Sequence, residues 1–370
     1  METLHLIVAP IISLIMAVMA TTSIQALPTK PENLIKLEAT IHQVPSPKSA
    51  AFSPNGDELW VTSLMNKKTG IAVFDTSVIS SPKRAAGITL PDGGAVEVIF
   101  NKDGTRAYAS QMETGHVFEI DTGAKKILRT FNTAGQWTKI LLLSSDETKL
   151  YAANWLSNDV SEINLSTGEL IRKIKTVTMP RGLYVNASST ALYVAGFEEG
   201  EIQKIDLASG KGKVLFKTGG AMRHIVADEG RQILFISDMG TATIYKLSLK
   251  DDTVTKFATT DINPNTIALS SDKKMLIVSC RGKNYSEENY YIPGPEWGSV
   301  LLFDTTTGKM LDALVGGNQP TALDIYPDGR HFVFSDFLDA KLRIFSLLAY
   351  EELLRGHGGK SLVYKKELKK

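Results

Sequence analysis

The chain has 370 residues, of which 43% are hydrophobic and 22% are charged, and its formal net charge is +1. This composition is typical of a globular protein with a large core, and the near-neutral charge excludes a general electrostatic attraction to nucleic acid or to a membrane. The chain has one cysteine, Cys280, which excludes an internal disulfide and a metal site built from several cysteines.

The first segment of the chain is a candidate export signal. Residues 4–20, LHLIVAPIISLIMAVMA, contain no Asp, Glu, Lys or Arg, and the small and polar stretch TTSIQA follows them. This pattern predicts a signal peptide over residues 1–26, with cleavage after Ala20 or Ala26. An uncleaved membrane anchor is the alternative, because the usual basic residue before the apolar run is missing. Either interpretation places the folded part outside the cytoplasm, in the periplasm or at the cell surface.

A three-residue motif recurs seven times along the rest of the chain. It reads LWV at 59–61, AYA at 107–109, LYA at 150–152, LYV at 192–194, LFI at 234–236, LIV at 276–278 and FVF at 332–334. A strand and a polar turn such as SPNGDE or YPDGRH come before each copy, and two more strands joined by a turn such as DTTTGK follow it. Four short antiparallel strands in about 42 residues form the blade of a β-propeller.

The two ends of the repeat region are predicted to meet. The seventh unit has only three strands, TALDIY, HFVFS and KLRIFSL, whereas the alternating segment IKLEATIH at 35–42 precedes the first unit. We expect this segment to be the outer strand of the seventh blade, which would remove exposed sheet edges, although it could instead merely cover an edge. The predicted fold is an all-β, seven-bladed β-propeller over residues 35–348 with an N-terminal strand closing the last blade. Residues 349–370 predict a short helix and a solvated basic tail.

Two stretches carry a resemblance to a known repeat family. SSDETKLYAANWLSNDVSEINLSTGELIRKI and YPDGRHFVFSDFLDAKLRIF resemble the YVTN-type β-propeller repeat, whose pattern is roughly SPDG-x-LYV, a loop, and V-x-VID-x-TGK-VV. The resemblance covers about residues 35–348. It implies a ring fold that occurs in exported and surface-layer proteins, and related rings include lactonases and amine dehydrogenase subunits. Such a fold does not determine a function, which must come from the site.

The repeat register places a set of cations at one end of the central channel. The residue eleven positions before each motif lies at the mouth of an innermost strand, and these residues are Lys48, Val96, Lys139, Arg181, Arg223, Asn265 and Thr321. Four of the seven are cationic, which predicts a site for an anion, with Arg181 and Arg223 able to bind a carboxylate or phosphate bidentately. His224, Asn265 and Gln319 are the expected polar neighbours. In the alternative interpretation the cations pair with acidic loop residues, Glu97, Asp238 or Asp336, and only join the blades.

Two further features are predicted to surround this mouth. The loop after each motif carries large side chains, among them Trp155 and Phe197, which form either a pocket wall or blade packing. The sixth repeat has an insertion in the same loop, residues 281–299, which contains Arg281, Tyr290 and Trp297. We expect this insertion to be a recognition loop over the mouth, the alternative being a loop that packs on its neighbours without a ligand.

The leading functional prediction is an exported binding propeller that holds a small anionic ligand or an envelope protein at the basic mouth, without a cofactor. One alternative is a metal-dependent hydrolase of the lactonase type, with oxygen ligands from Glu97, Asn154 and Asp238. Another is an envelope scaffold with no small ligand. The sequence lacks GxSxG and HExxH motifs, and four rim cations are few for binding a nucleic-acid strand.

Overall fold

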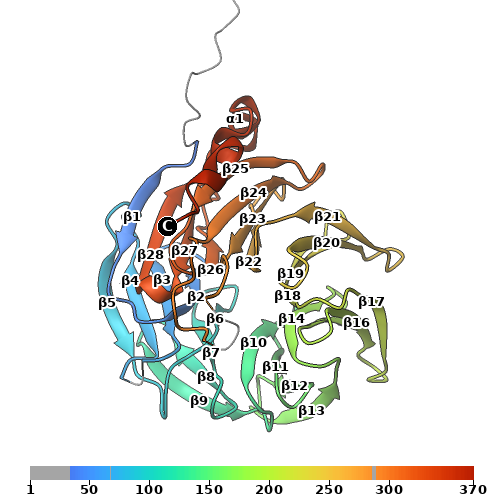
Figure 1. Ribbon diagram of the computed structural model, residues 1–370. Coiled ribbons are helices and arrows are strands. Elements are labelled where there is room, and N and C mark those ends of the chain that lie inside the picture. Colours follow the sequence, from blue (N-terminus) through green and yellow to red (C-terminus); the bar gives the residue numbers. More distant parts are fainter. Residues whose placement is uncertain (1–33, 67, 286–288) are drawn as a thin grey trace, which may run out of the picture. The chain divides into compact units, whose positions relative to one another are not determined.

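The computed structural model describes residues 34–66, 68–285 and 289–370. The predicted signal peptide, residues 1–26, lies outside the described residues. The described chain forms seven four-stranded antiparallel sheets arranged in a ring around a central channel (Figure 1). This confirms the predicted all-β, seven-bladed propeller. Among the described residues no helix is both long and apolar enough to cross a membrane.

Each blade uses four strands that follow one another along the chain, from the channel outward. Blade one has β2 (Pro47–Phe52), β3 (Glu58–Ser63), β4 (Ile71–Asp75) and β5 (Lys83–Ile88). Blade two has β6 (Val98–Phe100), β7 (Arg106–Gln111), β8 (His116–Asp121) and β9 (Lys126–Asn132). Blade three has β10 (Thr138–Leu143), β11 (Lys149–Asn154), β12 (Asp159–Asn164) and β13 (Leu170–Lys175). Blade four has β14 (Pro180–Val185), β15 (Ala191–Gly196), β16 (Glu201–Asp206) and β17 (Gly212–Lys217).

The remaining blades follow the same order. Blade five has β18 (Met222–Asp228), β19 (Ile233–Asp238), β20 (Thr243–Ser248) and β21 (Val254–Thr259). Blade six has β22 (Pro264–Leu269), β23 (Met275–Cys280), β24 (Ser299–Asp304) and β25 (Met310–Val315). Blade seven has β26 (Pro320–Ile325), β27 (His331–Asp336) and β28 (Lys341–Ser346), and β1 (Leu37–Ile41) pairs antiparallel with β28 as its outer strand. The predicted closure of the ring is therefore confirmed.

The recurring motif is the buried centre of the second strand in each blade. Trp60, Tyr151 and Phe235, its middle residues in blades one, three and five, are fully buried. They pack between neighbouring sheets in apolar clusters that run around the ring. Burial of such large side chains is the main favourable contribution to the stability of a sheet fold. The motif was visible in the sequence because every blade needs the same inter-sheet packing.

The innermost strands are bulged where they begin. In β10, for example, Thr138 pairs with Asn154 and Leu141 with Ala152, so one extra residue stands on the inner strand. Similar register shifts occur near the start of β2, β14, β18, β22 and β26. A bulge leaves a residue out of the ladder and re-aims its side chain. Six of the seven rim positions predicted from the sequence lie within these bulges, whereas Val96 precedes β6, whose pairing with β7 has no register shift.

Hydroxyl groups on the second strands join each blade to the next. Ser110 on β7 accepts a hydrogen bond from the Glu97 N–H at 3.2 Å and donates one to the carbonyl of Lys139 in the following blade at 2.6 Å. Four equivalent hydroxyls donate to the next inner strand, namely Thr62, Ser237, Ser279 and Ser335. These bonds satisfy backbone groups that the bulges leave unpaired. They also fix the backbone that carries the rim side chains.

The C-terminal segment is folded against blade six. It contains the helix α1 (Tyr350–Arg355) and the 3₁₀ turns η2 (Gly359–Leu362) and η3 (Tyr364–Lys366). Tyr364 is buried and its hydroxyl donates to Asp261 at 2.9 Å, while Lys369 forms a β-bridge with Glu296. The short helix is where the sequence predicts it. The lysines at 365, 366, 369 and 370 are exposed, as expected of a solvated tail, but the Tyr364 ring and the Lys369 backbone have partners, so the tail is not a free end.

Candidate functional site

Five cationic side chains from five blades surround the mouth of the channel. Lys48, Lys139, Arg181 and Arg223 are each the second residue of an innermost strand, and Arg281 directly follows β23. Lys139, both strand arginines and Arg281 are each less than 10% exposed. The charges of Arg281, Arg223 and Arg181 all lower the pKa of Lys48, so the five form a single electrostatic cluster. The structure thus brings together the four cations read from the repeat register and adds Arg281 from the insertion.

None of these five cations forms an ion pair with a carboxylate in the part of the chain that the structure describes. The Nη1 atom of Arg181 and the Nε atom of Arg281 are buried without any hydrogen-bond partner. Among the described residues, the one side-chain hydrogen bond of Arg223 goes to the sulfur of Met239, at 3.5 Å. Unpaired buried cations are unfavourable, so this cluster is complementary to an anion.

The acidic residues that the pairing interpretation requires have other partners. Asp336 pairs with Arg343 at 2.9 Å within blade seven. Asp238 accepts hydrogen bonds from the Thr218 hydroxyl at 2.6 Å and from the Ala221 N–H at 2.8 Å. Glu97 is close enough to Arg181 to affect its pKa, but its hydrogen bond comes from the Ser49 hydroxyl, at 3.0 Å. The described structure therefore gives no support to a purely structural pairing of the rim cations.

Burial and repulsion by neighbouring cations lower the pKa of both rim lysines, Lys48 and Lys139. Burial first, and then the charges of Arg181, Lys48 and Arg223, lower the pKa of Lys139 to about 4. The same two causes lower the pKa of Lys48 well below its ordinary value. The arginines stay protonated at neutral pH even where burial lowers their pKa, because a guanidinium starts from a very high value. An anion at the mouth would oppose these effects and favour protonated lysines.

Aromatic side chains form one wall of the mouth. The ammonium group of Lys139 lies over the ring of Trp155 and 5.1 Å from the centre of the Trp137 ring. Trp155 also meets Phe197 of blade four edge to face, with centroids 5.5 Å apart. Trp155 therefore both packs between blades and contacts a rim cation. Sequence analysis missed Trp137, although an aromatic residue two positions before a rim lysine is a signal that could have indicated it.

The blade-six insertion reaches the same mouth through Tyr290. Its hydroxyl accepts a hydrogen bond from the Lys48 ammonium at 2.6 Å, and its ring centre lies 4.1 Å from the guanidinium carbon of Arg281. Gln319 donates to the carbonyl of Tyr290 at 2.8 Å and accepts from Arg281. Arg281, Tyr290 and Gln319 thus belong to the cluster.

Two other residues predicted for the site, Trp297 and Asn265, have partners elsewhere. Trp297 is held by the C-terminal tail. Its backbone N–H donates to the Leu368 carbonyl at 2.8 Å, and the Lys370 ammonium lies 4.5 Å from the centre of its ring. No contact in the described structure joins Trp297 to the rim cations. Asn265 is fully buried at the start of β22, where it donates to the Thr321 carbonyl at 3.1 Å and its Oδ1 atom has no partner.

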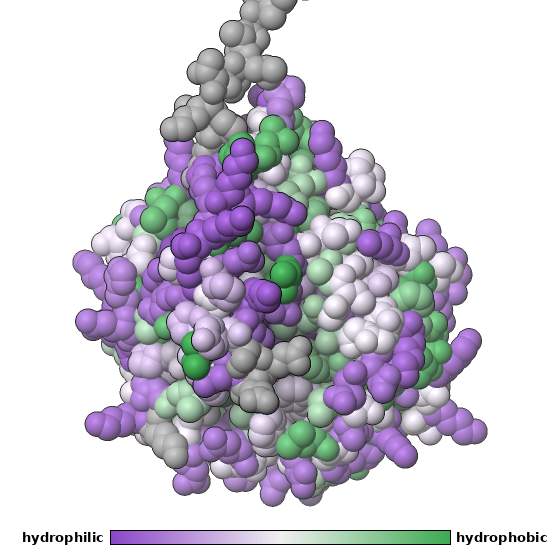
Figure 2. Space-filling view, in the orientation of Figure 1, coloured by the Kyte–Doolittle hydropathy of each residue, from purple (hydrophilic) through white to green (hydrophobic). Residues whose placement is uncertain are grey.

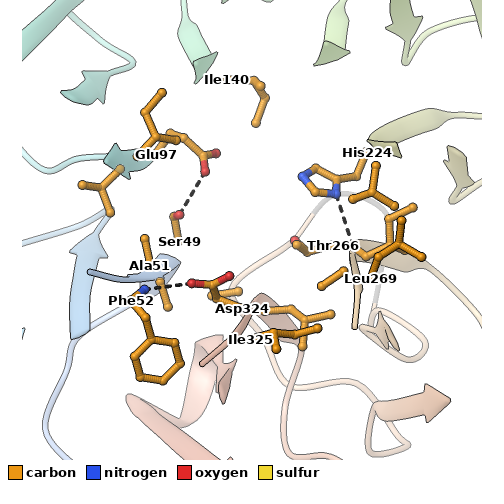
Figure 3. A pocket seen from close by; sticks show the side chains of 18 of the residues that line it. Ser49, Ala51, Phe52, Glu97, Ile140, His224, Thr266, Leu269, Asp324 and Ile325 are labelled. Carbon is orange, nitrogen blue, oxygen red and sulfur yellow. Dashed lines mark hydrogen bonds between the residues drawn. The ribbon is translucent and has the colours of Figure 1, made fainter. Parts of the chain in front are cut away.

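A cavity of about 630 Å³ lies along the inner strands, and Lys48, Arg181 and Arg223 contribute to its wall. Figure 3 shows Glu97 and His224 on opposite sides of this cavity, with Asp324 toward Phe52. Burial raises the pKa of Glu97 to about 7 and that of Asp324 to about 6. Burial and the neighbouring arginines lower the pKa of His224 to about 4. The cavity thus combines Lys48, Arg181 and Arg223 with two carboxyl groups and an imidazole. Sequence analysis did not identify Asp324, which lines the cavity from β26.

The oxygen ligands considered for a metal-dependent hydrolase have separate roles. Asn154 accepts from the Thr138 hydroxyl at 2.6 Å and donates to Asp159 at 2.7 Å within blade three. Asp238 closes a turn in blade five, whereas Glu97 faces the cavity. The described residues contain no group of three or more His, Cys, Asp or Glu side chains that could hold a metal ion.

Comparisons with known proteins agree with the ring fold. No family model matches the chain, so the resemblance to the YVTN-type repeat stays a prediction. The chain is 38% identical over 261 residues, 68% of its length, to Antigen Lp49 of Leptospira interrogans, and it spans 57% of that relative. Hydrazine synthase of Kuenenia stuttgartiensis superposes with a TM-score of 0.68 at 15% identity, covering 81% of this chain and 95% of that one. At this identity the likeness shows the fold alone, a seven-bladed β-propeller, and the function has to be argued from the site.

Proposed function

We propose that this protein is an exported binding protein that holds a small anionic compound at the basic mouth of its propeller. The observation that carries the proposal is the set of five buried or half-buried cations without a carboxylate partner among the described residues, two of them with unpartnered guanidinium nitrogens. Without a ligand that pairs with these groups, the folded protein would always bear the full desolvation cost of the buried charges. A cavity of about 630 Å³ next to the cluster is of the size that small-molecule sites have.

The proposed location rests on two further observations. The uncharged apolar run at residues 4–20 is typical of an export signal, and the curated relative is named an antigen, which suggests exposure at a cell surface. We therefore place the propeller in the periplasm or at the cell surface. Detection of the mature N-terminus by mass spectrometry of envelope fractions tests both the export and the cleavage after Ala20 or Ala26. Recovery of the full-length chain from the cytoplasm would contradict this placement.

An acidic protein partner is a second candidate for the same face. Trp137, Leu156 and Ile262 lie in loops at the mouth end of the blades and are each at least 40% exposed. Figure 2 shows such apolar side chains as separate spots among hydrophilic ones. Protein interfaces commonly combine exposed aromatic and apolar groups with a charged centre.

Binding is tested by titrating the purified protein with carboxylates and phosphates in a thermal-shift screen, followed by calorimetry. We expect stabilisation by some of these anions, and its loss in an Arg181→Gln, Arg223→Gln double variant. The matched control is Arg330→Gln, because Arg330 is exposed in the turn at the opposite end of β26. Equal stabilisation of the double variant and the control would show that the rim arginines do not bind the anion. If no small anion stabilises the protein, the acidic partner becomes the leading candidate.

A further inference from the structure

The five cations divide into two groups according to the blades and the neighbours that they have. The first group, Lys48 and Arg281, comes from blades one and six and lies on either side of Tyr290. The second group comes from the inner strands of three consecutive blades and consists of Lys139, Arg181 and Arg223. In a ring of seven, blade three lies opposite blades six and seven and blade four lies opposite blades seven and one, whereas blade five, which carries Arg223, adjoins blade six (Figure 1). Lys139 and Arg181 therefore lie across the ring from the pair at Tyr290.

Each group has unused capacity to donate hydrogen bonds. In the first group, and among the described residues, the Nε atom of Arg281 has no hydrogen-bond partner and the Lys48 ammonium donates only to the hydroxyl of Tyr290. In the second group, the Nη1 atom of Arg181 has no hydrogen-bond partner in the described part of the chain, where the Lys139 ammonium lies over the rings of Trp137 and Trp155. One carboxylate binds one guanidinium bidentately and cannot satisfy donors on both sides of a ring.

We propose that the ligand carries at least two separate oxyanion groups, one held by Lys48 and Arg281 and the other by Arg181, Arg223 and Lys139. This inference rests on the proposed function and adds the class of ligand, a dicarboxylate, a polycarboxylate or a compound with several phosphoryl groups. The rings of Tyr290 and Trp155 lie beside the two groups and would contact the carbon skeleton between the charges. Glu97 and Asp324 line the cavity along the inner strands, so a multiply charged ligand stays at the mouth.

The test is calorimetric titration with two ladders of anions. The first runs from acetate through malonate, succinate, glutarate and adipate, and the second from phosphate through pyrophosphate to tripolyphosphate. We expect the best dianion to bind at least about tenfold more tightly than any monoanion, because each extra charge-assisted contact is worth about 1.5–3 kcal/mol. The ladder that gives the tighter binding distinguishes carboxylates from phosphoryl compounds.

Two single variants locate the two charges of the ligand. Arg281→Gln removes a donor from the first group and Arg181→Gln one from the second, and each should weaken the dianion by about tenfold or more. A monoanion should respond to only one of them. Arg281→Lys keeps the charge but changes the contact with Gln319, so it separates the loss of charge from the loss of that contact. Arg330→Gln removes an exposed cation and is the control for a change of net charge.

The outcomes separate this inference from the proposed function. If monoanions bind as tightly as dianions, or if the dianion responds to variants of one group only, the ligand has a single anchored charge. The inference then fails and the anion site stands. If neither ladder binds to the wild-type protein, both fail together.

Discussion

Replacing Arg223 with methionine should make the ligand-free protein more stable while it weakens anion binding. Arg223 is 8% exposed, and burial and then the charges of Arg181 and Arg281 lower its pKa well below the ordinary value. Methionine keeps most of the length of the side chain and fills the same space without the charge. Most substitutions of buried residues destabilise a protein, so an increase in stability would be a specific sign of electrostatic strain.

The size of the effect follows from the surroundings of Arg223. Two like unit charges ~8 Å apart repel by about 2 kcal/mol at an effective dielectric constant of ~20. The charges of Arg181 and Arg281 oppose the charge of Arg223, and Tyr290 and Glu97 favour it, so we expect a net gain on the order of 2 kcal/mol. With an entropy of unfolding of ~2.1 cal/mol/K per residue, a propeller of roughly 330 residues gains about 3 °C in Tm from this increase in stability.

Differential scanning calorimetry at low ionic strength measures this change, and the Arg330→Met variant serves as the control. The control should leave Tm within about 1 °C, because exposed substitutions usually change stability by less than ~0.5 kcal/mol. The Arg223→Met protein should also lose most of the stabilisation that a bound anion provides. A lower Tm, together with unchanged anion binding, would refute the argument and show that Arg223 contributes to the fold.

Three further predictions concern the surroundings of the cluster. Since the pKa of Lys139 is lowered to about 4 from an ordinary value of 10.5, the unfolded chain binds a proton that the folded state lacks between these values. The free energy of unfolding should therefore rise between pH 7 and pH 9, with this group contributing up to about 1.4 kcal/mol per pH unit. Urea titrations should show a smaller rise for Lys139→Met, and an equal dependence on pH in the two proteins would contradict this prediction. Trp155→Phe should reduce the fluorescence change on anion binding, because Trp155 contacts Lys139, as Trp137 also does. Trp297→Phe should retain the change, since Trp297 contacts Lys370; the opposite pattern would exclude Trp155 from the site. Ser110→Ala should lower the free energy of unfolding by about 1–3 kcal/mol, because the hydroxyl that joins two blades is buried. Ser145→Ala is the control, since Ser145 is exposed. An equal effect of the two substitutions would contradict the role of the Ser110 hydroxyl in joining the blades.

The repeat made the fold and the rim predictable from the sequence. Each blade must bury the centre of its second strand in the same way, so a residue counted back from that centre falls at the same place in every blade. Lys139 and Arg223 could therefore be assigned to one ring before any contact was known. The closing strand β1 was predictable for a related reason, since a seventh blade with three strands leaves a sheet edge unpaired.

The contacts of these residues could not be predicted in the same way. Whether the rim cations pair with Asp336 depends on Arg343, which lies on the neighbouring strand of blade seven and binds that carboxylate instead. Trp297 was assigned to the mouth because its loop is there, but residues 368–370 of the tail lie against it. Contacts between residues so far apart in the sequence depend on how the chain ends pack, and no periodic pattern reports them.

The architecture explains how a propeller can keep such an unfavourable cluster. Repulsion among the cations acts on side chains that sit in bulges, whereas the backbone beneath them is held by the hydroxyl bridges, such as that from Ser110 to the Lys139 carbonyl. The cost of the charges is thus offset by bonds and buried apolar surface elsewhere in the ring, and the rim does not relax. Because the donors remain fixed and unpaired, an anion needs to reorganise little of the protein to bind them. The same rigidity predicts that affinity depends on the spacing of the ligand's charges, which the dicarboxylate ladder measures directly.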